Sequence, residues 1–108
     1  MSWTVICLNA RVEAELYSLP KDMQAHFLHI SELLQEFGPQ QVGLPHVRPL
    51  GNKLWEMRLT GRAGIGRAIY VAASGQKLIV LHVFIKKSQK TPKGAIQTAL
   101  RRLRELEP

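Results

Sequence analysis

The residues of this sequence that could do chemistry are basic side chains in or directly after apolar runs. Five of them stand out by position: Arg58, Arg67, Lys86, Lys87 and Lys90. When RNA is cleaved through its own 2′-hydroxyl, extra negative charge builds on the phosphate, and fixed Arg and Lys groups can stabilise that charge without a metal. Arg can also bind phosphate through two hydrogen bonds and stack on bases. From the residues alone, a phosphate-binding surface without catalysis is an equally good interpretation.

The positive charge of the chain is concentrated in its second half. The net charge is +7, and it divides into −2 for residues 1–50, +4 for residues 51–81 and +5 for residues 82–108. Such a one-sided distribution favours a polyanionic partner, either nucleic acid or the ribosome, over a merely basic soluble protein.

The composition indicates a folded domain and excludes several classes of protein. Of the 108 residues, 45% are hydrophobic, which is typical of a globular chain. The single cysteine, Cys7, excludes a disulfide framework within the chain and a multi-cysteine zinc site. No apolar run approaches the ~20 residues that a membrane span needs, and no signal-sequence pattern is present. We therefore expect one domain over residues 1–108, located in the cytoplasm.

Hydrophobic spacing predicts the elements that must position the basic side chains. Strands are predicted at residues 3–8, 54–60, 65–73 and 78–85, and helices at residues 9–19, 20–37 and 92–106. The segment 39–53 contains three prolines and is expected to be a loop. This order predicts an α+β fold in which two N-terminal helices pack on a small, mainly antiparallel sheet, followed by a C-terminal helix.

Three local patterns make more specific predictions. The continuous apolar run Leu78–Ile85 is typical of a strand that is covered on both faces, in the middle of a sheet. Thr91 and Pro92 predict the start of a helix, with Thr91 as its N-cap. Glu13 and Glu15 are expected to point outward near the positive end of the first helix.

Other chemistries have little support in the sequence. There is no Walker loop and no nucleophile elbow. The run Gly61–Gly64 matches the GXXG clamp of KH domains, but its flanks predict strands where that clamp joins helices. His26 and His29 lie one turn apart without a third ligand at a suitable spacing. We expect them to be exposed helix residues, and no metal or cofactor is predicted.

Three segments of the sequence resemble the RelE/HigB toxin superfamily. They are Leu54–Arg58, Arg67–Tyr70 and, most specifically, Leu81–Pro92, which ends in Lys-Thr-Pro. Further segments are similar to the phage-derived, HigB-type branch of that superfamily: Leu19–Pro20, Glu36–Pro39 and Pro45–Leu50. The resemblance spans nearly the whole chain.

The resemblance implies both a fold and a function. The implied fold is two helices against a small curved sheet. The implied function is that of a ribosome-dependent mRNA endonuclease, the toxin of a type II toxin–antitoxin pair, whose partner is a helix-turn-helix antitoxin of HigA type. By position, Arg58, Arg67 and Lys87 fall where the superfamily has catalytic basic residues. Nucleic-acid contacts are expected from four further basic residues: Arg62, Lys86, Lys90 and Lys93.

The sequence departs from the superfamily pattern at the start of the last helix. Some RelE members have a tyrosine there that stacks on the substrate base, whereas Lys93–Ile96 contain none. The group that activates the 2′-hydroxyl is open: Glu56, His82 or a lysine with a burial-lowered pKa could serve, and His82 could instead be a packed strand residue. Two other functions stay open: a non-catalytic member of the fold, either a ParE-like gyrase inhibitor or a decayed toxin, and a plain RNA-binding module.

Overall fold

One five-stranded sheet organises the computed structural model, which describes residues 3–86 and 91–106. The strand order is β1-β5-β4-β3-β2. β1 is parallel to β5, and every other neighbouring pair is antiparallel. The strands are β1 (Thr4–Cys7), β2 (Val47–Gly51), β3 (Leu54–Gly61), β4 (Gly64–Ala73) and β5 (Lys77–Lys86).

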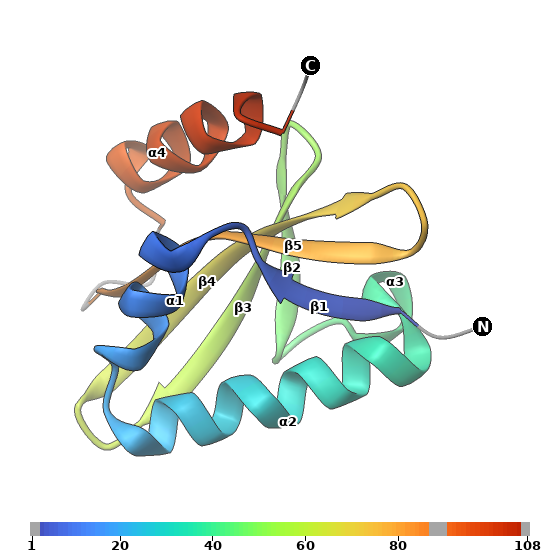
Figure 1. Ribbon diagram of the computed structural model, residues 1–108. Helices are drawn as coiled ribbons and strands as arrows, with labels where there is room; N and C mark the ends of the chain where they lie inside the picture. Colours follow the sequence, from blue (N-terminus) through green and yellow to red (C-terminus); the bar gives the residue numbers. More distant parts are fainter. Residues whose placement is uncertain (1–2, 87–90, 107–108) are drawn as a thin grey trace.

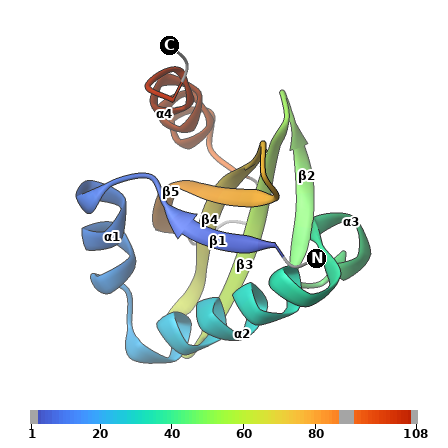
Figure 2. The ribbon, with the colours of Figure 1, turned by 45° about the vertical axis from the view of Figure 1, so that its right-hand side comes forward.

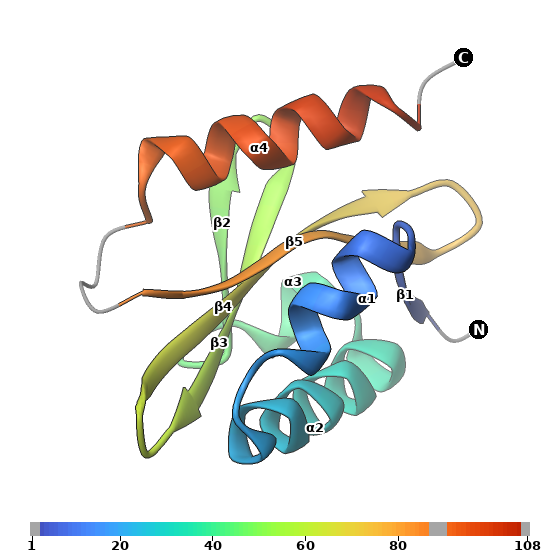
Figure 3. The same cartoon turned by 60° about the vertical axis from the view of Figure 1, so that its left-hand side comes forward.

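Helices cover both faces of this sheet, as Figure 1 shows. α1 and α2 lie on one face, and α4 lies on the other (Figure 3). The sheet is twisted, so β1 and β2 at its two edges run in different directions (Figure 2). Over the part of the chain that the structure describes, no helix is long and apolar enough to cross a membrane. The helices are α1 (Ala10–Tyr17), α2 (Lys21–Phe37), α3 (Pro39–Val42) and α4 (Lys93–Arg104).

Two buried apolar clusters, one on each face, hold the layers together. The larger cluster joins α1 and α2 to the sheet through residues such as Val12, Met23 and Tyr70. The smaller one joins α4 to the sheet and is built by Leu54, Ile69, Val71, Ile79, Leu81, Ala95 and Ala99. The α+β fold predicted from the sequence, with two N-terminal helices on a mainly antiparallel sheet and a C-terminal helix, is confirmed.

The ends of α1 and α2 follow from single residues. The side chain of Asn9 accepts a hydrogen bond of 3.1 Å from the backbone N–H of Val12, so Asn9 is the N-cap of α1. α2 ends at Gly38, whose φ of +82° is unfavourable for residues with a side chain. A Cβ there would also lie 2.9 Å from Nε1 of Trp3, so Gly38 lets β1 approach the end of α2 closely.

The segment 39–53 is not the loop that its prolines suggested. It contains the short helix α3 and the edge strand β2, which pairs with β3. Pro49 is compatible with β2 because an edge strand has one side that makes no ladder hydrogen bonds. Gly51, Asn52 and Lys53 all have positive φ and form the tight turn into β3.

The run Leu78–Ile85 lies in β5, which is an interior strand, as expected, only where β1 pairs with it from Lys77 to Val80; Ile85 near its other end is exposed. Leu78 and Val80 face the α1/α2 cluster, whereas Ile79 and Leu81 face α4, so both faces of β5 are covered. The middle strand, however, is β4 and not β5, because β2 adds a strand at the far edge.

The turn Gly61–Gly64 joins two antiparallel strands, so it is not a KH clamp. A Cβ on Gly61 would lie 2.7 Å from Asp22 Oδ1 and 2.8 Å from Met23 Cγ. The turn therefore packs tightly on the start of α2. The backbone N–H of Arg62 donates a hydrogen bond of 2.7 Å to Asp22 Oδ2, which fixes the same contact.

Candidate functional site

Two arginines that were predicted to belong to the catalytic site lie side by side on the face of the sheet that α4 covers. Arg58 in β3 is directly opposite Arg67 in β4, and Arg67 is opposite Phe84 in β5. Alternation along β3 places Arg58 on the same face as Leu54, which packs with α4. The three strands β3, β4 and β5 are neighbours in the sheet, in the order β5-β4-β3.

A buried carboxylate holds Arg67 in this row. Arg67 and Glu56 both have no exposed surface, and Arg67 Nη1 donates a hydrogen bond of 2.6 Å to Glu56 Oε1. Arg48 Nε donates to the same oxygen at 3.1 Å, and the Thr91 hydroxyl donates to Glu56 Oε2. Alternation along β3 puts Glu56 on the same face as Arg58, and Glu56 is fully buried there because Thr91 and α4 cover it.

Arg58 differs from Arg67 in its surroundings. Its side chain is half-buried, and its Nε is enclosed without a hydrogen-bond partner among residues 3–86 and 91–106. A guanidinium group forms its strongest hydrogen bonds with phosphate or carboxylate oxygens. The enclosed Nε is not itself open to a ligand, but the side chain is partly exposed and makes no ion pair with a described carboxylate, so its positive charge is available to an anion beside Arg67.

Among the described residues, the other basic residues predicted for this site are not directly opposite Arg58 or Arg67 in the sheet. Arg62 is exposed in the turn between β3 and β4, and Lys93 is exposed at the first residue of α4. Lys86 ends β5, where its backbone pairs with Ile65. The predicted residues Lys87 and Lys90 lie outside the described residues.

His82 belongs to a second polar cluster, between α1, β5 and α4. Its Nδ1 lies 3.0 Å from Glu15 Oε1, and its ring stacks on Phe84 with centroids 4.9 Å apart. Arg102 donates two hydrogen bonds of 3.0 Å to Glu15, one to each carboxylate oxygen, and a third of 2.9 Å to the carbonyl of Leu81. Glu15 thus does not point outward as expected; it binds the side chains of β5 and α4.

Glu15 is held in its ionised form by these contacts. Burial by itself would raise the pKa of Glu15, but the hydrogen bonds from Arg102, from the backbone N–H of Val83 and from His82 outweigh it. The pKa of this carboxyl is therefore lower than that of a free Glu. Neutral His82 would donate Nδ1–H to this carboxylate, which leaves Nε2 as its proton acceptor.

Three histidines cluster where α2 meets the segment before β2. The ring centroids of His26, His29 and His46 are 5.5–6.4 Å apart. The expectation of exposed helix histidines is wrong for His26, which accepts a hydrogen bond of 2.8 Å from the backbone N–H of Thr60. Burial and the neighbouring His46 and His29 lower the pKa of His26. In the part of the chain that is described, no group of three or more His, Cys, Asp or Glu residues is arranged to hold a metal ion.

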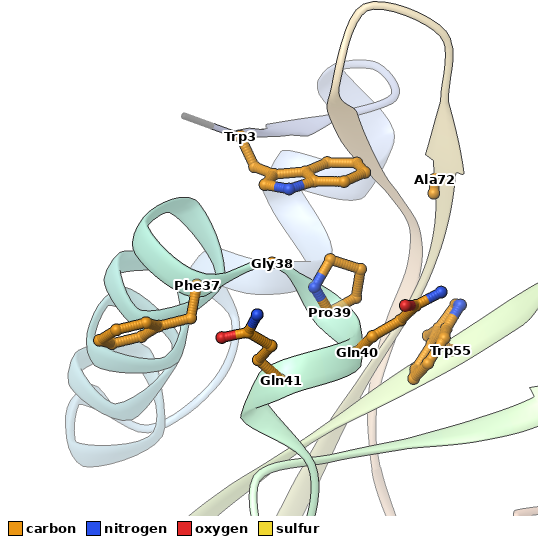
Figure 4. A pocket seen from close by; sticks show the side chains of 8 residues that line it. All are labelled: Trp3, Phe37, Gly38, Pro39, Gln40, Gln41, Trp55 and Ala72. Atoms are coloured by element: carbon orange, nitrogen blue, oxygen red, sulfur yellow. The ribbon is translucent and has the colours of Figure 1, made fainter. Parts of the chain in front are cut away.

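A separate pocket of about 270 Å³ lies at the other end of the sheet (Figure 4). Trp3 and Trp55 lie on two of its sides, and Pro39 lies between them (Figure 4). Trp55 alternates with Glu56 along β3, so this pocket opens on the opposite face of the sheet from the arginines.

Sequence reasoning missed the polar partners of the predicted residues. Arg48 is directly opposite Glu56 in the β2–β3 ladder, where the two form a pair of opposite charges. The sequence does contain a signal for this pair: Val47–Gly51 followed by Asn52 is compatible with a strand that ends in a hairpin turn. Arg102 follows Arg101 in the last turn of α4 and had no sequence signal of its own, because an amphipathic helix end with several arginines is usually solvated.

Solved structures show which class of protein has this fold. The free RelE toxin of E. coli, determined as a mutant with two arginines replaced by alanine, matches with a TM-score of 0.65 and 15% identity over 95% of this chain and 99% of that chain. The archaeal RelE–RelB complex from Pyrococcus horikoshii OT3 matches with a TM-score of 0.56 and 20% identity over 83% of this chain and 100% of that chain. The fold is therefore that of the RelE toxins.

The sequence itself assigns the chain to a family. The family described as "Phage derived protein Gp49-like" matches residues 14–104, and the chain belongs to it. This assignment and the RelE fold confirm the resemblance to the phage-derived branch of the RelE/HigB superfamily. No curated protein matches the sequence significantly.

Proposed function

We propose that this protein is the toxin of a type II toxin–antitoxin pair and that it cleaves mRNA on the ribosome through the 2′-hydroxyl of the RNA, without a metal. The observation that carries the proposal is the pair formed by Arg58 and Arg67 on adjacent strands. Arg67 is a buried, fixed positive charge, and the half-buried Arg58 beside it forms no ion pair with a carboxylate among the described residues. Such a pair supports charge stabilisation at a phosphate.

In the proposed reaction these residues act on the phosphate. Arg58 binds a non-bridging oxygen of the scissile phosphate, and Arg67 adds a fixed positive field behind it. Lys87, which the family resemblance places at the site, is proposed to stabilise the same developing charge. Arg62 and Lys93 are proposed to bind neighbouring phosphates.

For the group that activates the 2′-hydroxyl, we favour His82 or a lysine over Glu56. Glu56 is unsuited to this role because it has no exposed surface and already binds Arg48, Arg67 and Thr91. The side chain of His82 is 17% exposed, and the contact of its Nδ1 with Glu15 leaves Nε2 as a proton acceptor. A lysine with a lowered pKa is the other candidate.

The proposed partners are the ribosome with its mRNA and an antitoxin encoded next to this chain. One of the similar RelE structures is a complex with RelB, which supports a protein partner for this fold. We propose that the antitoxin is a helix-turn-helix protein of HigA type and that the two form a hetero-oligomer. A net charge of +7 supports both an acidic partner surface and a polyanionic substrate.

Induction of the protein in bacteria, with mapping of mRNA ends, tests the function. We expect growth arrest, and cuts that appear only in translated messages. Arg58→Ala should abolish the cuts while the protein stays folded. Arg101→Ala, which removes the same charge from an exposed position on α4, serves as the matched control and should cleave normally.

Two outcomes would contradict this proposal. A DNA-damage response with intact mRNA would support a gyrase inhibitor on the same fold instead. Binding to ribosomes or RNA with no cuts and no arrest would support an RNA-binding module or a decayed toxin.

A further inference from the structure

Thr91 lies two residues before the first residue of α4 but does not cap the helix, contrary to the sequence prediction. The N-cap is Pro92, which makes no side-chain hydrogen bond to the helix. The Thr91 hydroxyl instead donates to Glu56 Oε2, and it accepts a hydrogen bond of 3.1 Å from Arg48 Nη2. A hydroxyl suited to capping a helix is thus used to attach the start of α4 to the sheet.

Glu56 is the centre of this attachment. Its carboxylate in β3 joins Arg48 in β2, Arg67 in β4 and Thr91 ahead of α4. Glu56 and Arg67 have no exposed surface, and Thr91 is only 8% exposed. Water cannot easily replace these partners, so the hydrogen bonds restrict each group to one geometry.

The attached groups flank the proposed site. Arg67 lies opposite Arg58 in the β3–β4 ladder, and Lys93 begins α4 two residues after Thr91. The carboxylate therefore sets the relative position of a buried cation on the sheet and an exposed cation at the helix start. Catalytic side chains need supporting hydrogen bonds of this kind, since a displacement of about 1 Å can cost on the order of 100-fold in rate.

We propose that Glu56 is a positioning residue for RNA cleavage and that it acts through Arg67 and through the Thr91 hydroxyl. This inference rests on the proposed function. It gives Glu56 an orienting role in place of the acid–base role that the sequence had left open for it. It also assigns supporting roles to Arg48, which the sequence did not single out, and to Thr91, which the sequence predicted only as a helix cap.

The test measures ribosome-dependent cleavage in single-turnover experiments beside equilibrium binding to ribosomes. Thr91→Val keeps the shape of the side chain and removes the hydroxyl, whereas Thr91→Ser keeps the hydroxyl. Thr98→Val makes the same exchange at a half-buried position of α4, outside this network, as a matched control. Arg48→Lys keeps the charge but cannot bind Glu56 and Thr91 together through one guanidinium. All variants are compared at a temperature where circular dichroism shows them fully folded.

We expect Thr91→Val and Arg48→Lys to lower the single-turnover rate on the order of 10- to 100-fold, with ribosome binding nearly unchanged. Thr91→Ser should restore most of the rate, and Thr98→Val should retain it. A folded Thr91→Val protein that cleaves at the wild-type rate would overturn the positioning role while leaving the ribonuclease proposal intact. If the wild-type protein does not cleave, the proposed function and this inference are both wrong.

Discussion

At the scale of single residues, burial changes what a substitution at Arg67 should do. The sequence predicts that Arg67→Ala stays folded and loses growth arrest. In the structure the guanidinium is fully buried against Glu56, so Ala leaves that buried carboxylate with one cation fewer. Breaking a buried ion pair typically costs about 3–5 kcal/mol. We therefore expect the midpoint of urea unfolding to fall markedly in Arg67→Ala.

Arg58→Ala is the comparison for this prediction. Arg58 is half-buried and pairs with no carboxylate among the described residues, so its loss should leave the urea midpoint nearly unchanged. An Arg67→Ala protein as stable as Arg58→Ala would show that the Glu56 pair does not support the fold.

Glu15 predicts a dependence of stability on acid pH. Because its folded-state pKa is lower than the ordinary Glu value of 4.5, the unfolded chain binds its proton first as the pH falls. The stabilisation is complete above about pH 4.5 and is lost as the pH falls through the lower folded-state pKa. Wild-type protein should therefore lose stability below this pH more steeply than Glu15→Gln, as measured by chemical unfolding at a series of pH values. Parallel curves for the two proteins would contradict the pKa shift.

At the scale of elements, the contact between the β3–β4 turn and α2 depends on a missing side chain. Gly61→Ala would place a Cβ 2.7 Å from Asp22 Oδ1 and 2.8 Å from Met23 Cγ, so either the turn or these two side chains must shift. We expect a loss of about 1–3 kcal/mol, as for other overpacked sites. Thermal unfolding measures this loss.

Gly94→Ala is the matched control for Gly61→Ala. Position 94 is an exposed residue of α4, and a Cβ there meets nothing within 4 Å. Ala should stabilise the helix by about 0.5–1 kcal/mol relative to Gly. The same substitution should thus change stability in opposite directions at the two sites, and equal effects would show that the turn does not pack closely on α2.

At the scale of the whole molecule, the uneven charge predicts strongly salt-dependent binding to ribosomes. If Lys90 contacts a phosphate only electrostatically, Lys90→Ala should weaken binding and reduce the salt slope by about one unit. If Lys87 stabilises the transition state, Lys87→Ala should instead lower the cleavage rate on the order of 100-fold or more at nearly constant binding. Binding across a salt series, measured beside cleavage, separates the two roles. Equal losses in binding alone would remove Lys87 from the catalytic group.

The sequence by itself determined the fold class and most of the strands and helices. The alternation of apolar and polar residues in β3 and the apolar run of β5 are patterns between near neighbours in the sequence, and so is the position of Asn9 before a helix. These elements can therefore be predicted without knowing any long-range contact. The adjacency of Arg58 and Arg67 followed from the two strands and the short turn between them.

Only the tertiary structure decided which partners these residues have. Glu56 binds Thr91, which is 35 positions away, and Glu15 binds Arg102, which is 87 positions away. Such contacts depend on how α1 and α4 lie on the sheet, and no spacing along the chain encodes them. Thr91 shows the physical reason most clearly. Its hydroxyl could accept a hydrogen bond from a backbone N–H as a local helix cap, but it accepts from the Arg48 guanidinium and donates to the Glu56 carboxylate, because charged groups form stronger hydrogen bonds than neutral ones.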